Sequence, residues 1–558
     1  MTEFSPNDTY TSPLASRNAS PEMLRIWSPR HKFNTWRRIW LAIAEAQHEV
    51  TKDWGSDSDS SSLRARSASE GSSGDGESQS LARASGSSRQ GPLVTKEQVE
   101  ELRAVVERGI TDEELARASE IERDLRHDVM AHVHCLGESC PTAKPIIHLG
   151  CTSQDVVCNA DMVCLQQSIQ LVLKKVQLVT LALGLQARSW KRLPTLGFTH
   201  YQTAQPVTVG RRLAHWALDL EQGRWHHPFL GGAYDVVFRG LRGATGTQAS
   251  FLSLLAQDDD PHGAVEELEG QFLWRLFNIY HPEEDWSAGA IRDRKAAADV
   301  AAMSTYLITG QTYSRSIDSR VLAYLADIAA VLHKIATDIR LLSNRKEIDE
   351  PFGANQIGSS AMPYKRNPMK CERICGLTRF VMNLVGNAYD TAATQWLERT
   401  LDDSSNRRLS LPEAFLALDG SLDLMHQVAS GLVVNEAMVR KNLMAELPFL
   451  ATENILMEAV KLGGDRQDLH EKIRVHAQAA GARVKQEGLD NDLIERLRND
   501  DAFAAVHHLL TEDALLDPMK YVGRSVEQTE RFLAEVVEPL RERYADELAN
   551  LCGSDRGV

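Results

Sequence analysis

"QTYSRSIDSRVLAYLADIAAVLHKIATDIRLLSNRKEIDE", residues 311–350, carries the clearest structural signal in this chain. Its large apolar residues recur at alternating intervals of four and three positions. They are Val321, Leu325, Ile328, Leu332, Ile335, Ile339 and Leu342. This spacing places them on one stripe of an α-helix and is typical of a bundle seam. Because no glycine or proline lies between Gly310 and Pro351, the helix could run about 50 Å or more at 1.5 Å per residue.

A second stripe with the same alternation precedes it in the chain. Its members are Leu165, Ile169, Val172, Val176, Val179 and Leu183. Thr111 and Glu114 form a capping-box signature at the start of another helical stretch, 115–134. We find no β-α-β alternation, no G-x-G-x-x-G and no Walker loop, so a nucleotide-cofactor domain is not supported. We therefore predict an all-α protein with a long central helical bundle, which several subunits could share.

Length and composition further limit the possible folds and functions. A chain of 558 residues is too long for one ordinary core, so two to four domains are expected. The net charge of -15 argues against general nucleic-acid binding, although it does not exclude a local cationic pocket for an anionic substrate. No run of about 18 apolar residues occurs, which argues against a membrane span, and the N-terminus shows no secretory signal.

The cysteines indicate a reducing compartment. None of the eight belongs to a C-x-x-C pair, and their spacings match no zinc pattern. We expect free thiols in a cytoplasmic protein and no metal site. The adjacent His226 and His227 are interpreted as surface residues, because no partner carboxylate lies near them in the sequence.

One segment differs in composition from the rest. Residues 56–91 are rich in serine and glycine and lie between two helical patterns. Such a segment buries too little apolar surface to offset its ordering entropy, so we predict a disordered insertion. An inert insertion and a phosphorylated regulatory loop both remain open.

Several polar islands interrupt the helical patterns. They lie at 126–128, 150–155, 197–206, 243–248, 310–320, 358–368 and 398–408. Each places Ser, Thr, His, Gln or Arg beside a glycine, a proline or a helix end. Taken singly, each is as well explained by a helix cap or a solvated turn.

Taken together, the islands resemble one family. "SSAMPYKRNP" at 359–368, followed by Glu372, resembles the signature of the fumarase/aspartase superfamily. The stretches "RHDVMAHVH", "GFTHYQTAQP", "QIGSSAMPYKRNPMKCER" and "ERTLDDSSNRR" resemble the adenylosuccinate lyases within it, and the likeness runs from about residue 15 to 545, insertions aside.

The resemblance implies an activity. A member would eliminate fumarate from adenylosuccinate, giving AMP, and from SAICAR, giving AICAR, in purine nucleotide biosynthesis. It implies no metal or organic cofactor. It also implies a homotetramer whose active sites are each built from segments of three different subunits. The expected domains are an N-terminal helical domain at 1–151, a central bundle at 152–434 that carries most of the site, and a C-terminal helical domain at 435–558.

The residues present suit this chemistry. Eliminating fumarate needs a base for the Cβ proton, an acid for the departing nitrogen and stabilisation of an aci-carboxylate. The substrates also carry two carboxylates and a phosphate, which arginine binds well through bidentate hydrogen bonds. By resemblance, Ser359 is the base on a mobile lid, His200 is the acid, Glu372 orients His200, and Lys365 acts on the carboxylate. The expected substrate-binding residues are Arg17, Arg126, His127, Asp128, Thr152, Ser153, Gln311, Asn367, Arg373, Arg399, Ser404 and Arg408.

Three features depart from the family pattern. Asn18 stands where the family usually has tyrosine. Pro228 and the glycines at 231–232 would break a helix that should be continuous. The stretch from 257 to about 296 is longer than the family needs. Two other interpretations therefore stay open: a sister enzyme such as argininosuccinate lyase or fumarase, and a catalytically silent member with a structural or binding role.

Overall fold

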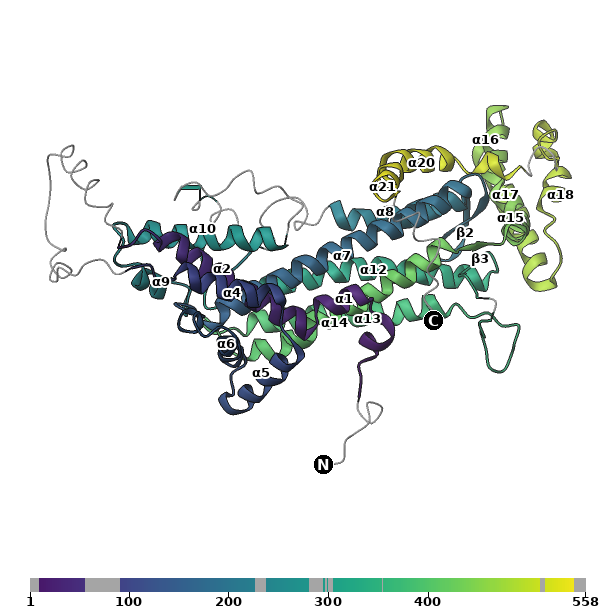
Figure 1. The fold of residues 1–558 in the computed structure, drawn as a ribbon. Helices are drawn as coiled ribbons and strands as arrows, with labels where there is room; N and C mark the ends of the chain where they lie inside the picture. Colours follow the sequence, from purple (N-terminus) through teal and green to yellow (C-terminus); the bar gives the residue numbers. More distant parts are fainter. Residues whose placement is uncertain are drawn as a thin grey trace, which may run out of the picture.

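The computed structural model of this chain describes residues 10–55, 91–225, 237–280, 295–296, 299, 305–353, 355–511 and 517–545. Its centre is a bundle of long helices (Figure 1). These are α7 (Ser153–Ser189), α8 (Val209–Trp225), α12 (Ser316–Asn344), α13 (Met369–Ala393) and α14 (Asp402–Ser430). Helix α12 packs on α13 and α14, while α7 packs on α8 and α14. The predicted all-α fold with a long central bundle is confirmed.

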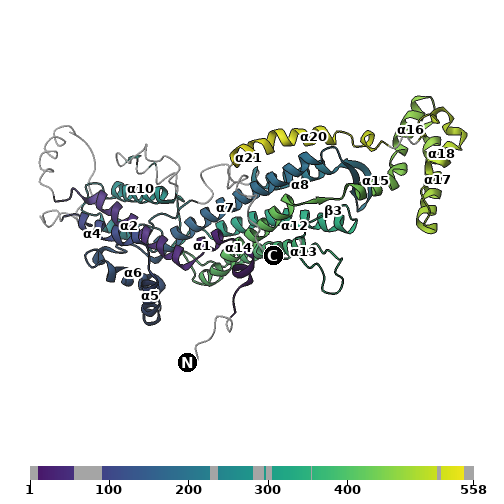
Figure 2. The ribbon, with the colours of Figure 1, turned by 45° about the vertical axis from the view of Figure 1, so that its right-hand side comes forward.

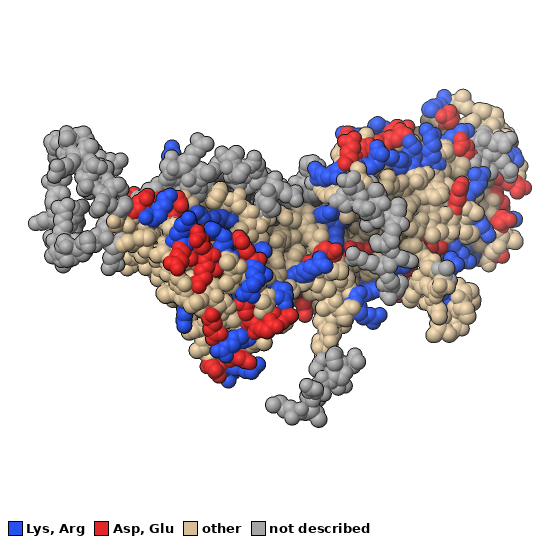
Figure 3. Space-filling model, in the orientation of Figure 1, with Lys and Arg blue, Asp and Glu red and all other residues tan. Residues whose placement is uncertain are grey.

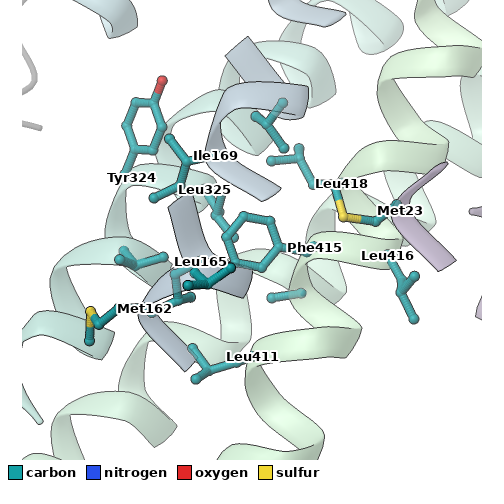
Figure 4. Close-up of a cluster of buried hydrophobic side chains, with 14 of the residues drawn as sticks. Met23, Met162, Leu165, Ile169, Tyr324, Leu325, Leu411, Phe415, Leu416 and Leu418 are labelled. Atoms are coloured by element: carbon teal, nitrogen blue, oxygen red, sulfur yellow. The ribbon is translucent and has the colours of Figure 1, made fainter. Parts of the chain in front are cut away.

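The apolar stripe at 321–342 is the seam of α12, as predicted. All seven of its members are 5% exposed or less, and burying each such side chain contributes roughly 1.5–3 kcal/mol. Figure 4 shows Leu325 of α12 beside Leu165 of α7 and Phe415 of α14. The helix has 29 residues, about 43 Å. It is shorter than predicted because it begins only at Ser316, after a loop that carries Gln311.

Helix α7 is the longest element. It has 37 residues and therefore spans about 55 Å. By length and composition alone it is apolar enough to cross a membrane, although the sequence had suggested no such segment. However, 61% of its most apolar window is buried inside the structure, as expected for the core helix of a bundle. Residues that the second stripe predicted to be inside, such as Leu165 and Val172, are fully buried.

The N-terminal helices cover the end of the bundle where α7 begins (Figure 1). They are α2 (Pro29–Thr51), α4 (Lys96–Arg108), α5 (Asp112–Leu125) and α6 (Asp128–Ser139). Before them, α1 (Pro21–Ile26) packs on α7 and α14, and a π-helical turn at Leu14–Asn18 packs on α14. The predicted capping box of Thr111 and Glu114 is present at the start of α5. Burial would raise the pKa of the Glu114 carboxyl, but hydrogen bonds from Thr111, Ser139 and two arginines outweigh it and lower that pKa to about 2.

The connections around the bundle contain the few strands. An antiparallel hairpin, β1 (Pro194–Thr199) and β2 (Gln202–Thr208), follows α7, and β3 (Ile348–Asp349) pairs with β4 (Val433–Val434). Helix α9 (Ala249–Leu254) precedes the stretch predicted to be extra, and α10 (Pro261–Tyr280) occupies about half of it. The Ser-rich segment up to residue 90, the histidines at 226–227 and the helix break at 228–232 lie outside the described residues.

The C-terminal region has a small core of its own. Helices α15 (Glu436–Leu450), α16 (Thr452–Lys461), α17 (Arg466–Ala482) and α18 (Leu493–Arg498) lead into short turns, and α20 (Ser525–Phe532) and α21 (Glu538–Arg543) follow. Residues between Ala451 and Leu510 form a separate buried cluster. Helices α20 and α21 then lie along α7 and α8 (Figure 2). The contact is close, because a Cβ added at Gly184 of α7 would lie 2.4 Å from the side chain of Val537.

The charged surface and the cysteines of the described residues agree with what the composition predicted. Acidic and basic side chains are interspersed over the face shown in Figure 3. The seven cysteines in the described residues are free, and six of them are buried.

Candidate active site

The junction between α5 and α6 places three predicted substrate-binding residues in a row. Arg126 adopts a left-handed backbone with φ of 54°, which costs about 1–3 kcal/mol in a non-glycine residue. His127 is the N-cap of α6, and its Nδ1 accepts from the Met130 N–H at 3.3 Å. The neutral ring therefore carries its proton on Nε2, which lies 3.3 Å from the Ser153 hydroxyl. This contact joins the start of α6 to the start of α7.

Asp128 connects the same junction to α14. Its Oδ2 accepts from Arg408 at 2.6 Å, and its Oδ1 accepts from the backbone N–H of Val129 at 2.8 Å. Burial raises the pKa of the Asp128 carboxyl, but Arg408 and the backbone bond together with Lys32 lower it overall. Asp128 therefore stays ionised and holds the guanidinium of Arg408 beside His127.

A buried carboxylate fixes the start of α7. The Thr152 N–H donates to Asp155 Oδ2 at 2.7 Å in a capping box. Asp155 Oδ1 accepts from Arg239 and from the backbone N–H groups of Arg242 and Gly243. Asp155 and Arg239 are both fully buried, and a buried pair of this kind is costly to break. Thr152 and Ser153 are thus held against the loop 239–243.

Three further predicted residues touch one another beside the start of α14, and one of them, Gln311, comes from the loop before α12. Arg399 donates to Gln311 Oε1 at 3.0 Å and to the Ser404 hydroxyl at 3.1 Å. Beneath them, Asp403 is fully buried and accepts from Arg315 at 2.7 Å. Turning over the side-chain amide of Gln154, the neighbour of Ser153, lets it accept from Arg399 as well.

His200 lies at the tip of the β1–β2 hairpin. Both central residues of the turn, His200 and Tyr201, have positive φ, at 53° and 58°. Such turns normally take Asn or Gly, so the hairpin holds an exposed histidine in a strained position. A cavity of about 700 Å³ adjoins the hairpin and is lined by Thr199 and Tyr201 along with residues of α8, α12 and 521–528.

The stretch 358–368 forms a loop between β3 and α13. Asn367 donates to the Gly358 carbonyl at 2.8 Å and closes the base of the loop. The Ser359 hydroxyl accepts from the Met362 N–H at 3.1 Å, the bond expected of a serine that caps a turn. Tyr364 near the tip is 84% exposed. Ser359 and Lys365 therefore lie on a projecting loop with a tied base.

A cationic cavity lies where this loop meets α13. It has a volume of about 460 Å³, and Arg17, Lys370 and Arg373 line it together with Asn18 and Gln356. None of the described residues that line it carries a carboxylate. Burial, and secondarily Arg17, lower the pKa of the Arg373 guanidinium. Three cationic side chains therefore lie around the cavity, with no carboxylate among its described lining residues.

Asn18 belongs to the wall of this cavity. Its Oδ1 accepts from Arg373 Nε at 2.8 Å, and its Nδ2 donates to the Pro13 carbonyl at 2.7 Å. The Arg17 carbonyl accepts from Arg373 Nη2 at 2.6 Å. Asn18 is the residue at which this sequence departs from the family pattern. Its uncharged side-chain amide thus orients Arg373.

The predicted residues form two groups at opposite ends of the bundle. The first group holds Arg126, His127, Asp128, Thr152, Ser153, Gln311, Arg399, Ser404 and Arg408. The second group holds Arg17, His200, Ser359, Lys365, Asn367, Glu372 and Arg373. Helix α13 separates the lid at its start from Arg399 beyond its end, and its 25 residues span about 37 Å.

Several residues in these groups were not predicted. Asp155 could have been found, because it stands three residues after Thr152 in a capping-box pattern. Arg315 and Asp403 lie in the polar islands 310–320 and 398–408, but only the fold shows that they pair. Arg239 lies outside every island and gave no signal. Among the described residues, no group of three or more His, Cys, Asp or Glu could hold a metal ion.

Comparison with protein-family models gives two matches. The model described as "Lyase" matches residues 46–232 and 301–383, and the model described as "Adenylosuccinate lyase C-terminus" matches residues 448–532. The first match leaves out 233–300, which contains the whole stretch predicted to be extra.

Characterised relatives match over nearly the whole chain. Adenylosuccinate lyase of Schizosaccharomyces pombe is 42% identical, over 97% of this chain and 98% of its own. That of Saccharomyces cerevisiae is 41% identical, over 98% and 99%. Among solved structures, a fumarate lyase from Mesorhizobium has a TM-score of 0.68 at 19% identity, covering 93% of this chain and 98% of its own. A 3-carboxy-cis,cis-muconate lactonizing enzyme from Pseudomonas putida scores 0.67 at 21%, over 95% and 99%.

Proposed function

The chain belongs to the adenylosuccinate lyase family of the fumarase/aspartase superfamily, and we propose that its two groups of residues perform that family's elimination. The reaction releases fumarate from adenylosuccinate, giving AMP, and from SAICAR, giving AICAR. The cationic cavity beside the lid carries the proposal, since three cationic side chains around it suit a substrate with two carboxylates and a phosphate.

We propose catalytic roles that come from the family resemblance and fit where the residues lie. Ser359 removes the Cβ proton when the loop 358–368 closes over substrate, because closure brings the hydroxyl to the reacting carbon and excludes water. Nearby Lys365 favours the alkoxide and the developing aci-carboxylate. His200, held out by its strained turn, protonates the departing nitrogen, and Glu372 orients it.

The other end of the bundle binds the rest of the substrate. Thr152 and Ser153 donate to a succinyl carboxylate from the start of α7. His127 and Arg408, fixed by Asp128, reach the phosphate side. Arg126, Gln311, Arg399 and Ser404 complete the contacts, with Asn367, Arg17 and Arg373 acting from the lid end.

A complete site needs more than one copy of the chain. Within one protomer the first group is separated from the lid by the length of α13, about 37 Å for its 25 residues, far more than a nucleotide substrate spans. We therefore propose a homotetramer in which one chain's first group faces the lid of another. Exposed apolar side chains on the long helices, among them Phe380, Tyr389 and Leu409, support contacts between subunits.

We also propose a cellular compartment and a division of the chain into domains. Free cysteines support a cytoplasmic location. We divide the chain into domains at 1–151, 152–434 and 435–558, and the separate buried cluster between Ala451 and Leu510 supports the last of these.

The direct test is fumarate release by the purified protein given adenylosuccinate, beside a Ser359→Ala variant. We expect release by the wild-type protein and a loss of about 100-fold or more in the variant. No release from a correctly assembled wild-type protein would favour the silent or sister-enzyme interpretation. Equal rates in both would remove Ser359 from the mechanism.

A further inference from the structure

Glu350 lies just before the lid in the sequence, and its carboxylate contacts residues that come just after the lid. Its Oε1 accepts from the Lys370 N–H at 3.0 Å, and its Oε2 accepts from the Cys371 N–H at 2.9 Å. The side chain is buried. Helix α13 begins at Met369, and its N-cap residue, Pro368, provides no side-chain bond. Glu350 therefore caps α13 from the other side of the lid.

These two bonds complete the hydrogen bonding at the start of α13. The Met369 N–H donates to the Asn367 carbonyl at 2.9 Å, and the Glu372 N–H donates to the Pro368 carbonyl at 3.0 Å. The two N–H groups between them have Glu350 as their acceptor. A carboxylate at a helix N-terminus is also favoured by the helix dipole. Loss of this carboxylate would therefore leave two buried N–H groups without their acceptor, which is costly.

Two further contacts join the two sides of the lid, besides the Asn367 bond that closes its base. Lys370 Nζ donates to the Pro351 carbonyl at 3.2 Å. The Arg366 guanidinium lies 5.2 Å from the centroid of the Phe352 ring, a distance typical of a cation–π interaction. Several independent contacts thus hold the entry and the exit of the lid together.

The residue before Glu350 is itself anchored to the bundle. Asp349 belongs to β3, which pairs with β4. Its Oδ1 accepts from the Ser343 hydroxyl of α12 at 2.6 Å, and its Oδ2 accepts from Asn435 at 2.7 Å. Glu350 therefore extends from a fixed strand to the start of α13, the helix that carries two of the proposed site residues.

We propose that Glu350 is a positioning residue for the elimination, which holds the two sides of the lid together and confines its movement to residues 359–365. This rests on the proposed function, in which Ser359 and Lys365 act when the lid closes. Because both ends of the moving segment are fixed, closure has few ways to place the Ser359 hydroxyl. Loss of the Glu350 carboxylate should therefore slow the chemical step more than it weakens substrate binding.

Two variants separate this role from the capping of α13 alone. Glu350→Gln has nearly the same shape, but its amide accepts only through one oxygen, so one of the two N–H groups loses its acceptor. Lys370→Met removes the bond to Pro351 and leaves the cap of α13 in place. Thr95→Ala is the control for a lost cap elsewhere, because it removes the side-chain cap of α4 among the N-terminal helices.

The assay measures kcat and KM for adenylosuccinate, the melting temperature, and the rate of trypsin cleavage after Lys365 and Arg366, followed by mass spectrometry. Cleavage reports how often the base of the lid opens. We expect Glu350→Gln to lower kcat and to speed cleavage, each by about ten-fold or more, because losing a bond to a charged group shifts an opening equilibrium by that factor. KM should stay within a few-fold of the wild-type value. Lys370→Met should also speed cleavage, and Thr95→Ala should change neither rate.

Cleavage needs no turnover, so an inactive wild-type protein would count against the proposed function and leave the cleavage test intact. If Glu350→Gln had a lower melting temperature but unchanged kcat and cleavage, Glu350 would only cap α13 and the proposal would be overturned. Faster cleavage with unchanged kcat would overturn it as well. If Glu350→Gln did not fold, Lys370→Met would decide, and unchanged cleavage in that variant would show that contacts across the lid do not restrain it.

Discussion

Two variants that are each inactive should restore activity when they assemble together. One carries Ser359→Ala and loses the base on the lid. The other carries His127→Ala with Arg408→Ala and loses contacts at the opposite end of the bundle. In one protomer these positions are separated by the length of α13, 25 residues or about 37 Å. Each site must then take the two groups from different chains.

The expected recovery follows from counting. In a mixed oligomer with equal amounts of both chains, half of the positions that supply the lid hold an intact Ser359. Independently, half of those that supply the other group hold an intact His127. If association is random, about a quarter of the sites are complete, as the symmetry of a homo-oligomer requires. A site built within one chain would give no complete sites at all.

The assay is fumarate release by protein co-produced with two different affinity tags and purified through both, so that every particle contains both chains. Each variant alone, carried through the same steps, supplies the background. Recovery near a quarter of the wild-type rate supports a site shared between subunits. If the mixed oligomer releases fumarate no faster than either variant alone, the distance that we infer from α13 between Ser359 and the first group would be refuted.

Three further predictions concern single residues. Asp155→Asn leaves Arg239 buried without its counter-ion, so the free energy of unfolding in urea should fall by about 3–5 kcal/mol; a fall below about 1 kcal/mol would contradict the role given to this pair. Glu114 has a folded pKa of about 2 against an ordinary 4.5, so its stabilisation is complete above about pH 4.5 and is lost as the pH falls towards 2. Glu114→Gln should flatten acid unfolding across that window, and an unchanged profile would show that another group causes it. His200→Asn suits the left-handed turn, so the melting temperature should hold while fumarate release falls about 100-fold or more; full activity would exclude His200 as the acid.

The sequence was a good guide wherever one short stretch determines the outcome. The α12 seam and the capping box at Thr111 formed as predicted, because periodicity and capping act within a few residues. It was a poorer guide to interruptions. Nothing between Leu125 and His127 signals a break, yet α5 ends there and Arg126 takes a left-handed conformation. Tertiary contacts of the next helix, such as the bond from His127 to Ser153, settle that boundary.

The candidate site shows the same limit more strongly. Motif resemblance named the residues that we propose to meet substrate, because their chemistry fixes their type. It did not name Arg315 or Arg239, whose roles come from contacts with residues distant in the chain. The bonds of Asn18 to Arg373 likewise became visible only when α13 placed the two side by side.

The strained residues support the functional assignment independently of any motif. Within the described residues, seven non-glycine residues have positive φ: Arg126, His148, His200, Tyr201, Gln248, Lys346 and Leu397. Arg126 and His200 are themselves proposed site residues, Tyr201 follows His200, and Leu397 lies two residues before Arg399. Such conformations cost about 1–3 kcal/mol each and persist only where the surrounding structure enforces them. Leu397 is 98% exposed, so burial of its side chain gives no compensation within this chain. A chain selected for stability alone would place Gly or Asn at these turns. That this chain has Arg126 and His200 at two of them supports the roles that we propose for these residues.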